Sequence, residues 1–597
     1  GATMHSVYLV NDQCPNAYWD GTSTNYCPAF DADDVVSHEW SHAVTEYTDD
    51  LVYQFQSGAL NESNSDVFGE TIDLTDGRDS PLGGKDNTDY YSTLGLGVRW
   101  VVGEDLGKPA AALLLRDMWD PDNFPAPSPG KVTSPNYVCD AEGSSDNGGV
   151  HTNSGVPNHL YAILVDGKQY NGHTVRGIGL VKAAAIEYYA KSYKTPTSEF
   201  PDHADSLDAA CKDLIGKPLK KFDGSAFDGT DYDGKSYGAT ISADDCAQVA
   251  EASAAVELRA EPAQCAYEPL LQPESATPAP CGAGSSESDA LSEDWEKGVP
   301  ATWSVASNAT GDAFPEGLQW SVSAELPGGR VGKALYAADP TSGTCAAGGD
   351  ISGSFYAQSP QITLADDASH VSFTHYVATE RGFDGGNLML SVNGGDFTVL
   401  PASAYSFNPP NMNLSDAPTL PVQIPDPLGL GLDGNNTDPK AGQLAWSGTN
   451  QGHVYGSWGT TVANLSGLAG KGDKIVLRWD FGIDCASGVD GWYVDQVKVY
   501  SCKAATGGGS SGSGSSGGGS SGGGGGGDSG GGAAGLPLLL GLGGLAALRR
   551  RAALHPQVRT LLGASLTGFT EDAAGVVAAL DLGDGRCASV RAAYLVG

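Results

Sequence analysis

The sequence predicts a multidomain protein made of a mainly α-helical part, an all-β sandwich, a flexible Gly/Ser tether and a short apolar segment. Three observations predict this organisation. Helical and loop patterns fill residues 1–258, β patterns fill residues 288–503, and residues 507–532 contain only 17 Gly, 8 Ser and Asp528. With 597 residues, the chain is long enough for two or three domains with cores of their own.

The N-terminal part, residues 1–258, is predicted to be mostly helical. Residues 33–36 place two Asp before two Val, which is typical of a first helical turn because acidic side chains favour the positive end of the helix dipole. A turn predicted at Ser57-Gly58 would let a second helix run beside the first. The last helix-like run is residues 243–258, which are rich in Ala.

Residues 259–287 carry Pro, Ser and Glu and are predicted to connect two domains. From residue 288 the pattern becomes β. Every second residue of the run 475–481 is large and apolar, whereas the opposite face includes Arg478 and Asp480. Asn393-Gly394 lies between two apolar runs, as a hairpin turn would. We therefore predict an antiparallel β-sandwich over residues 288–503.

The C-terminal region begins with a tether, residues 504–532, that has no means of burying a core. Sixteen apolar residues follow, then three Arg, together residues 533–551. Because a membrane span usually needs about 20 residues, one interpretation is a small buried helix. The order of tether, apolar stretch and Arg cluster favours the other, a membrane-retention signal with its Arg residues on the cytoplasmic side. The tail, residues 552–597, has no predicted role.

Charge and cysteine content restrict the function. The 33 Lys and Arg against 72 Asp and Glu give a net charge of −39, which excludes nucleic-acid binding because a polyanion needs a basic footprint. The balance fits a soluble exported protein. Eleven Cys is an odd number, so at least one is unpaired or bonded to another chain.

The sequence HEWSH carries the strongest chemical signal. His38 and His42 are four residues apart, so on a helix both imidazoles can reach one metal while Glu39 faces the metal's open side. A catalytic zinc site needs three protein ligands and a water. Glu62 and Asp66, also four apart, would supply a carboxylate for the metal and a carboxylate that holds a ligand imidazole.

A second chemical segment is DNGGVHTNSG, in which Asp146 precedes His151 by five residues in a Gly-rich loop. A carboxylate this close orients the imidazole and favours its positive charge, which makes His151 available to an oxyanion. An isolated HExxH can be an ordinary surface helix, but all three segments in this order point to catalysis.

These segments resemble the thermolysin-like zinc metallopeptidases, the gluzincin group, over roughly residues 4–258. The resemblance implies that His38, His42 and Glu62 bind zinc. It implies that Glu39 is the general base, which takes a proton from zinc-bound water and passes it to the leaving amine. It also implies oxyanion stabilisation by His151 with Asp146 as its partner, assistance by Tyr53, and an Asp66 that holds His38.

Further positions match the family's substrate-binding residues. The resemblance implies that Asn16 and Ala17 belong to the edge strand that aligns the substrate backbone, and that Arg116 grips a substrate carbonyl. Val35, Val102 and Leu115 would form an apolar pocket for the residue after the cleaved bond. Such a pocket favours bulky apolar side chains by about 1–3 kcal/mol per methylene.

The sequence also departs from the family. The catalytic region there begins with a β-rich subdomain, and we expect this chain to start inside its last part. At the family's paired-calcium site, Asp34, Asp73 and Glu104 match ligand positions, but Arg99 and Val101 replace carboxylates. We therefore expect one calcium at most.

The cysteines suggest a disulfide framework. We predict pairs Cys14–Cys27, in keeping with an exported enzyme, Cys211–Cys246 and Cys485–Cys502, and we suggest Cys265–Cys281. The sequence does not choose partners for Cys139, Cys345 and Cys587.

The two ends of the β region resemble jelly-roll modules similar to MAM and carbohydrate-binding domains. Glu296 and Asp495 would either share a calcium or, as we favour, be solvated surface carboxylates. Four tryptophans would either stack on sugars or, as we favour, pack in the core; they are Trp295, Trp303, Trp479 and Trp492. Residues 507–551 resemble a GlyGly-CTERM sorting signal, although such signals normally end the chain.

Two functions remain in competition. The first is a secreted zinc metalloendopeptidase, extracellular or at the bacterial cell surface, which acts on peptides or proteins through zinc and carries an accessory sandwich. The second is a surface adhesion or glycan-binding protein whose protease region is vestigial, and a degraded gene fragment is a third possibility. We favour the first, because every catalytic position is intact.

Overall fold

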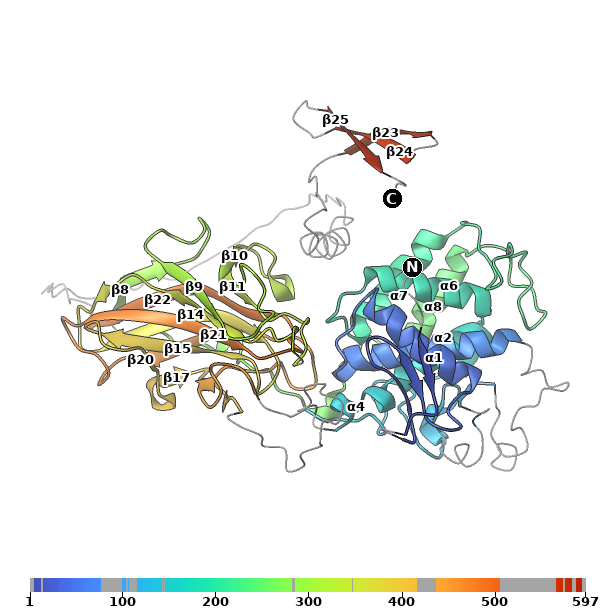
Figure 1. The fold of residues 1–597 in the computed structure, drawn as a ribbon, viewed down its shortest axis with the longest axis horizontal. Helices are drawn as coiled ribbons and strands as arrows, with labels where there is room; N and C mark the ends of the chain where they lie inside the picture. Colours follow the sequence, from blue (N-terminus) through green and yellow to red (C-terminus); the bar gives the residue numbers. More distant parts are fainter. Residues whose placement is uncertain are drawn as a thin grey trace, which may run out of the picture. The chain divides into compact units, whose positions relative to one another are not determined.

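The computed structural model (Figure 1) describes most of the chain. The residues described are 5–11, 14–76, 99–103, 106, 115–141, 143, 145–281, 285–345, 347–415, 436–504, 565–572, 575–581 and 587–592. Residues 1–509 and 510–597 form separate compact units.

The helical part of the first unit contains seven described α-helices. They are α1 (Asp33–Glu46), α2 (Phe55–Asp76), α4 (Asp146–Asn153), α5 (Gly155–Asp166), α6 (Leu180–Ala190), α7 (Phe200–Leu214) and α8 (Ala243–Ala255). Short 3₁₀ turns are η2 (Pro121–Asn123) and η3 (Lys191–Tyr193). Helix α5 is buried along nearly its whole length and forms the centre of the core. The predicted mainly helical character of this part is confirmed.

Helix α1 begins at the acidic pair that predicts it, with Asp33 and Asp34 in the first turn. The predicted turn at Ser57-Gly58 is wrong, because both residues lie inside α2. The chain reverses earlier, where the Thr45 carbonyl accepts the backbone N–H groups of Thr48 and Asp50. Gly58 is small for a packing reason: a Cβ there would lie 2.4 Å from Val150 Cγ1. α2 therefore packs closely against α4.

Short strands complete the helical part. A three-stranded sheet has the order β1 (Ser6–Tyr8), β3 (Thr24–Tyr26), β2 (Ala17–Trp19), so that β2 lies at its edge. Two strand pairs follow, β4 (Val101–Val102) with β5 (Arg116–Asp117) and β6 (Lys168–Tyr170) with β7 (His173–Val175). β3 is fully buried, whereas β2 is half-exposed.

The β region forms two antiparallel sheets. The first has the order β10 (Ser321–Ser323), β11 (Ala334–Ala338), β22 (Gly491–Ala504), β14 (Ser369–Ala378), β20 (Trp458–Asn464), β17 (Tyr405–Phe407), with β8 (Ser285–Glu293) also on β22. The second has the order β16 (Thr398–Val399), β15 (Gly385–Val392), β21 (Lys474–Ile483), β12 (Gly353–Gln358), β9 (Ser304–Ala309), with β13 (Ile362–Thr363) on β21. One apolar core joins residues of both sheets, which confirms the predicted sandwich.

Smaller elements border the sandwich. They are the strand pair β18 (Met412–Asn413) with β19 (Leu444–Ala445) and the 3₁₀ turns η4 (Ala263–Cys265), η5 (Glu274–Ala276), η6 (Pro327–Gly329) and η7 (Ala402–Ala404). The predicted hairpin is confirmed, because β15 pairs with β16 and both Asn393 and Gly394 have positive φ. The apolar face predicted for β21, from Ile475 to Phe481, is completely buried.

The four sandwich tryptophans are buried, as predicted from core packing, and Trp303 at 7% is the most exposed of them. They are therefore not available to stack on sugars. Glu296 is exposed, in keeping with the surface interpretation. That interpretation is wrong for Asp495, which is buried and accepts a hydrogen bond from Arg330 Nη2 at 2.9 Å.

Five disulfides pair ten of the eleven cysteines. They are Cys14–Cys27, Cys139–Cys265, Cys211–Cys246, Cys281–Cys502 and Cys345–Cys485. The predicted Cys14–Cys27 and Cys211–Cys246 pairs are confirmed, whereas Cys485–Cys502 and Cys265–Cys281 are wrong. The reason is strand pairing: β8 lies against β22 and brings Cys281 to Cys502, while Cys485 remains at the other end of β22.

In the second unit, β23 (Ser565–Asp572), β24 (Gly575–Asp581) and β25 (Cys587–Ala592) form an antiparallel sheet. The predicted tether beyond residue 504 and the apolar segment 533–551 lie outside the described residues. Within the part of the chain that the structure describes, no helix is both long and apolar enough to cross a membrane.

Candidate active site

Helices α1 and α2 bring three potential metal ligands together. The Nε2 atoms of His38 and His42, one turn apart on α1, are 3.0 Å apart. From α2, Glu62 places Oε2 3.6 Å from the His38 Nε2 and Oε1 3.4 Å from the His42 Nε2. The Glu62 side chain is fully buried, so its negative charge faces the imidazoles rather than solvent.

The outer nitrogens of both imidazoles are held by α2. His38 Nδ1 lies 2.9 Å from Asp66 Oδ1, and His42 Nδ1 lies 2.8 Å from Asn61 Oδ1. Both oxygens are acceptors, so each imidazole donates a proton from Nδ1 and directs Nε2 toward Glu62. Asn61 is not among the predicted site residues, although its place directly before a predicted ligand on the same helix is a signal for it.

The donor set fits a zinc ion. Two imidazole nitrogens and one carboxylate oxygen are a known catalytic combination for zinc, and Glu62 Oε2 is a buried atom with no hydrogen-bond partner among the described residues. Burial opposes ionisation of Glu62, but the positive charges of His151, His42 and His38 outweigh it and hold its pKa well below the usual range. The group is therefore anionic and directed at a common centre.

A cleft of about 410 Å³ opens over these ligands. Its lining includes the three ligands together with Glu39, Tyr53, His151 and the strand β2 residues Ala17, Tyr18 and Trp19. Glu39 lies on α1 between the two histidines in sequence, and burial raises its pKa above the usual value. A carboxylate with a raised pKa beside a metal site can accept and release a proton near neutral pH.

Tyr53 and His151 lie on the other side of Glu62. The Tyr53 hydroxyl donates a hydrogen bond to Glu62 Oε1 and is 3.3 Å from His151 Nε2. His151 Nδ1 is 2.5 Å from Asp146 Oδ1, the partner that the sequence predicts. The charge of Glu62, more than any other group, raises the pKa of His151. This shift favours a proton on the ring of His151, which lines the cleft.

The turn that positions His151 requires left-handed backbone. Asp146, Asn147, Gly148 and Gly149 all have φ between 45° and 88° inside α4. A Cβ on Gly148 would lie 2.3 Å from the Phe55 ring, so the backbone passes too close to α2 for any other residue. This close approach holds His151 over the cleft.

Arg116 bridges the carboxylates of α2. Its Nε and Nη2 each donate to one oxygen of Asp66 at 2.7 Å, and Nη2 is 3.7 Å from Glu62 Oε2. Asn158 of α5, which is not among the predicted site residues, donates a hydrogen bond to Asp66 Oδ2 at 2.7 Å. Burial disfavours the charged form of the Arg116 guanidinium, but the negative charge and hydrogen bonds of Asp66 outweigh this effect and raise the Arg116 pKa. Asp66 is thereby fixed for its contact with His38.

A smaller pocket of about 130 Å³, apolar on one side and lined by Arg116 and the site residues His38, Glu39 and His151 on the other, adjoins the cleft. The structure brings together here the three residues predicted for it, Val35 from α1, Val102 from β4 and Leu115 beside β5, and adds Phe30. Asn16 and Ala17 line both the pocket and the cleft, which places the edge strand along the same opening.

The positions predicted for calcium are only partly described. Asp34 is buried and accepts hydrogen bonds from the backbone N–H groups of Val35 and Gly103, and burial raises its pKa to about 6. Asp73 is buried as well, whereas Glu104 lies outside the described residues. Arg99 bonds Asp166 at 2.8 Å instead of supplying a ligand.

The comparisons with known proteins agree with this geometry. Residues 49–228 match the family model of the thermolysin metallopeptidase α-helical domain. The chain is 35% identical over 223 residues to a zinc metalloproteinase of Renibacterium salmoninarum, covering 35% of this chain and 37% of that protein. It is 36% identical over 226 residues to a bacillolysin of Brevibacillus brevis, covering 36% of this chain and 37% of that protein.

A solved structure, the precursor of protealysin from Serratia proteamaculans, matches with a TM-score of 0.27 and 21% identity, over 43% of this chain and 69% of that one. The chain spans little more than a third of the length of the curated relatives it matches, 37% for both named above. Within the helical part, the resemblance to thermolysin-like zinc metallopeptidases is confirmed.

Proposed function

We propose that this chain is a zinc-dependent endopeptidase that cleaves peptide bonds on the N-terminal side of bulky apolar residues. The observation that carries the proposal is the convergence of His38, His42 and Glu62 at the floor of a cleft that also contains Glu39. When bound there, zinc would act as a Lewis acid toward water and the scissile carbonyl.

Substrate alignment follows from the edge strand. Among the strands that the structure describes, β2 pairs only with β3, so its other edge can accept an extended peptide as an added strand. The pocket of Val35, Val102 and Leu115 opens beside it, which supports a preference for Leu or Phe after the cleaved bond. Phe30 adds to this apolar side of the pocket, so an apolar side chain placed against these residues gains by leaving water.

Proton transfer is assigned to Glu39. Its buried carboxylate would take a proton from the attacking water and deliver it to the leaving amine, as a group with a raised pKa can. Tyr53 and His151 would donate hydrogen bonds to the oxygen that becomes negative in the transition state. Asp146 and Asp66 are positioning residues, since each holds an imidazole by its Nδ1.

Export is part of the proposal. Five disulfides are typical of an oxidising compartment, and the large negative charge favours solubility. We retain Asp34, Asp73 and Glu104 as proposed calcium ligands. We do not favour the glycan-binding function, because the sandwich tryptophans that would stack on sugars are buried.

The proposal is tested by cleavage of matched peptides that carry Leu, Phe, Ala or Asp after the scissile bond. We expect cleavage before Leu and Phe, loss of activity in a zinc chelator, and recovery when zinc is returned. Cleavage that continues in the chelator would contradict the metal-dependent mechanism. Equal rates before Leu and Asp would contradict the assignment of the pocket.

A further inference from the structure

A second group of acidic side chains lies in the β-sandwich, far along the sequence from the peptidase residues. We call Asp339, Glu380, Asp384 and Asp484 the carboxylate cluster. Asp339 directly follows β11, Asp484 directly follows β21, and the other two lie in the loop between β14 and β15. Because β11 and β14 belong to one sheet and β15 and β21 to the other, the cluster lies where the two sheets meet.

The carboxylates are close together. One oxygen from each of Glu380, Asp384 and Asp484 lies within 4.8 Å of the others. The carboxyl groups of Asp339 and Asp384 are within hydrogen-bonding reach of each other. Three of the four are buried, with exposed fractions of 3% for Asp339, 1% for Asp384 and 6% for Asp484. Four acids thus share a space from which water is largely excluded.

No described Lys, Arg or His is paired with any of the four. The donors to the cluster are backbone N–H groups: Asp484 N to Asp384 Oδ1 at 2.5 Å, Ala486 N to Asp484 Oδ1 at 3.0 Å, and Val489 N and Glu380 N to Asp339 Oδ2. The other oxygen of Asp339, Oδ1, is buried and has no hydrogen-bond partner among the described residues. The Glu380 carboxylate accepts no hydrogen bond from them either.

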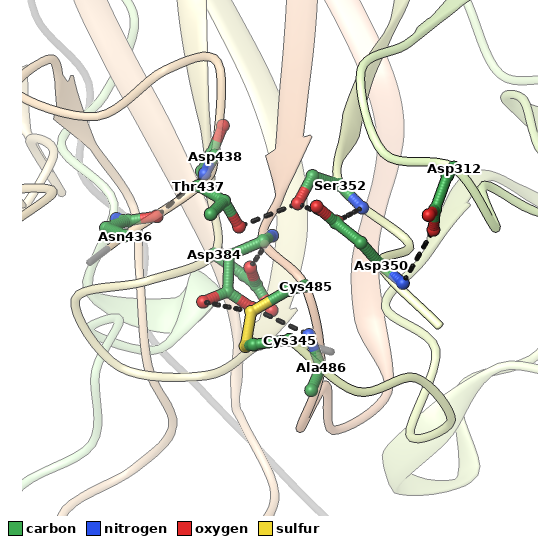
Figure 2. The surroundings of a disulfide bond; sticks show 11 residues. Asp312, Cys345, Asp350, Ser352, Asp384, Asn436, Thr437, Asp438, Cys485 and Ala486 are labelled. Atoms are coloured by element: carbon green, nitrogen blue, oxygen red, sulfur yellow. Dashed lines mark hydrogen bonds between the residues drawn. A yellow bond between two sulfur atoms is a disulfide. The ribbon is translucent and has the colours of Figure 1, made fainter. Parts of the chain in front are cut away.

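The surrounding backbone holds the acids together. The Asp384 carbonyl accepts hydrogen bonds from Thr379 Oγ1 at 3.0 Å and Ser447 Oγ at 2.7 Å, so the β14–β15 loop is fixed at both ends. The Cys345–Cys485 disulfide joins the residue next to Asp484 to the chain beyond β11, and Figure 2 shows Asp384 beside it. The folded backbone therefore holds the carboxylates close together although their charges repel each other.

The negative charge of the carboxylate cluster is not balanced by any cationic side chain among the described residues. Burial first, and then the neighbouring acids, raise the pKa of Glu380 to about 9 and that of Asp384 well above its usual range. Burial raises the pKa of Asp339 and of Asp484 to about 6. Like charges in a buried space are unfavourable unless a cation or protons neutralise them.

We propose that the carboxylate cluster binds one calcium ion that links the two sheets of the sandwich. All of the side-chain ligands are oxygens, without nitrogen or sulfur, which matches a hard divalent cation. Calcium accepts six to eight oxygen ligands in a flexible geometry, so carboxylates from three loops with water or backbone carbonyls can satisfy it. Glu296 and Asp495 are not part of this site, since Arg330 binds Asp495.

The first test counts bound calcium. The full chain carrying Glu39→Gln, which prevents self-digestion, is compared with the same chain bearing Asp384→Asn and Asp484→Asn. The matched control carries Asp396→Asn, an exposed acid in the same sandwich. After equilibrium dialysis against calcium, we expect one ion fewer per chain in the double variant, unchanged calcium in the control and unchanged zinc in all three. Equal calcium in all three proteins would overturn the proposal.

The second test uses the sign of a stability change. Without calcium, the double variant should unfold at a higher temperature than its parent, because removing like charges relieves repulsion. With millimolar calcium the order should reverse, since only the parent gains the ion. A variant that is less stable than its parent by the same amount in both conditions would show that the acids act through hydrogen bonds, or share protons, rather than bind calcium.

A third measurement needs no substitution at the cluster and covers the case in which the double variant fails to fold. In the Glu39→Gln chain, we expect calcium to slow amide hydrogen exchange in residues 379–385 and 484–490. Exchange in both segments that is independent of calcium would overturn the proposal.

Discussion

At the scale of single residues, Glu62 connects the proposed zinc ligands to the groups that we propose face the substrate. It lies 3.4 Å from His42 Nε2 and 3.4 Å from His151 Nε2, and it accepts the Tyr53 hydroxyl. With zinc held by Glu62 as proposed, Tyr53 and His151 would be left to face the substrate. Tyr53 and His151 are exposed, whereas Glu62 is buried. Their positions therefore suit Tyr53 and His151 for contact with substrate and Glu62 for contact with a metal.

The role of His151 predicts a kinetic result. His151→Gln should lower kcat about 10²–10³-fold with little change in KM, because a donor to the transition-state oxygen is lost. The matched control is His173→Gln, a surface substitution at a histidine that bonds Glu251 outside the cleft. Steady-state kinetics on one peptide check this. A rise in KM with unchanged kcat would contradict the assignment.

His375 is a buried histidine with a purely structural role. Its Nδ1 accepts a hydrogen bond from Trp492 Nε1 at 3.0 Å, and its Nε2 donates to Thr461 Oγ1 at 2.8 Å. Burial lowers its pKa to about 3, from an ordinary value of 6.5. The neutral ring therefore belongs to the folded sandwich, and protonation favours the unfolded chain.

The sign of the pH effect follows. Because the folded pKa is depressed, the stability from His375 is complete above pH 6.5 and is lost as the pH falls toward 3. At pH 5 the loss is about 2 kcal/mol. His375→Gln, whose amide can accept from Trp492 and donate to Thr461, should lack this dependence. Urea unfolding of both proteins in the Glu39→Gln chain measures it, and parallel pH profiles would contradict the account.

At the scale of elements, the left-handed start of α4 positions His151, the proposed donor to the transition-state oxygen. Gly148 combines a φ of 88° with a neighbouring Phe55 ring only 2.3 Å from where a Cβ would stand. Gly172, in the β6–β7 turn, has a φ of 83° and nothing within 4 Å. A substitution at Gly172 tests backbone strain alone, whereas the same substitution at Gly148 tests strain together with a steric clash beside the site.

Gly148→Ala should therefore lower kcat/KM by at least about tenfold, because the α4 turn must move and His151 with it. Gly172→Ala should cost about 1 kcal/mol of stability and leave kcat/KM unchanged. Kinetics and thermal unfolding of both variants check this. Equal activities in the two variants would show that the close packing of Gly148 on Phe55 does not position His151.

Part of the element structure is readable from the sequence. The Asp pair predicts the start of α1, the HEWSH spacing predicts that His38 and His42 share a face, and Glu62 follows on the next helix. Ser57-Gly58 misleads, because small residues mark close helix packing as well as turns. Asn158 and Phe30 are not predictable in the same way, since their contacts depend on which elements become neighbours.

At the scale of the whole molecule, pairing across long distances decides what the sequence leaves open. Cys281 meets Cys502 because β8 pairs with β22, a separation of 221 residues. The carboxylate cluster likewise collects residues from 339 to 484 through strand order. Local patterns predict a sandwich, but they do not give its strand order, and the proposed calcium site and the disulfides Cys281–Cys502 and Cys345–Cys485 depend on that order.

We propose above all that Glu39 acts as the general base at a metal held by His38, His42 and Glu62. The most direct test is turnover of a peptide with Leu after the scissile bond by Glu39→Gln, with zinc content measured on the same sample. The account predicts one zinc per chain, as in the unsubstituted protein, and a loss of kcat of at least about 10²-fold. Undiminished turnover by a zinc-loaded Glu39→Gln protein would contradict it.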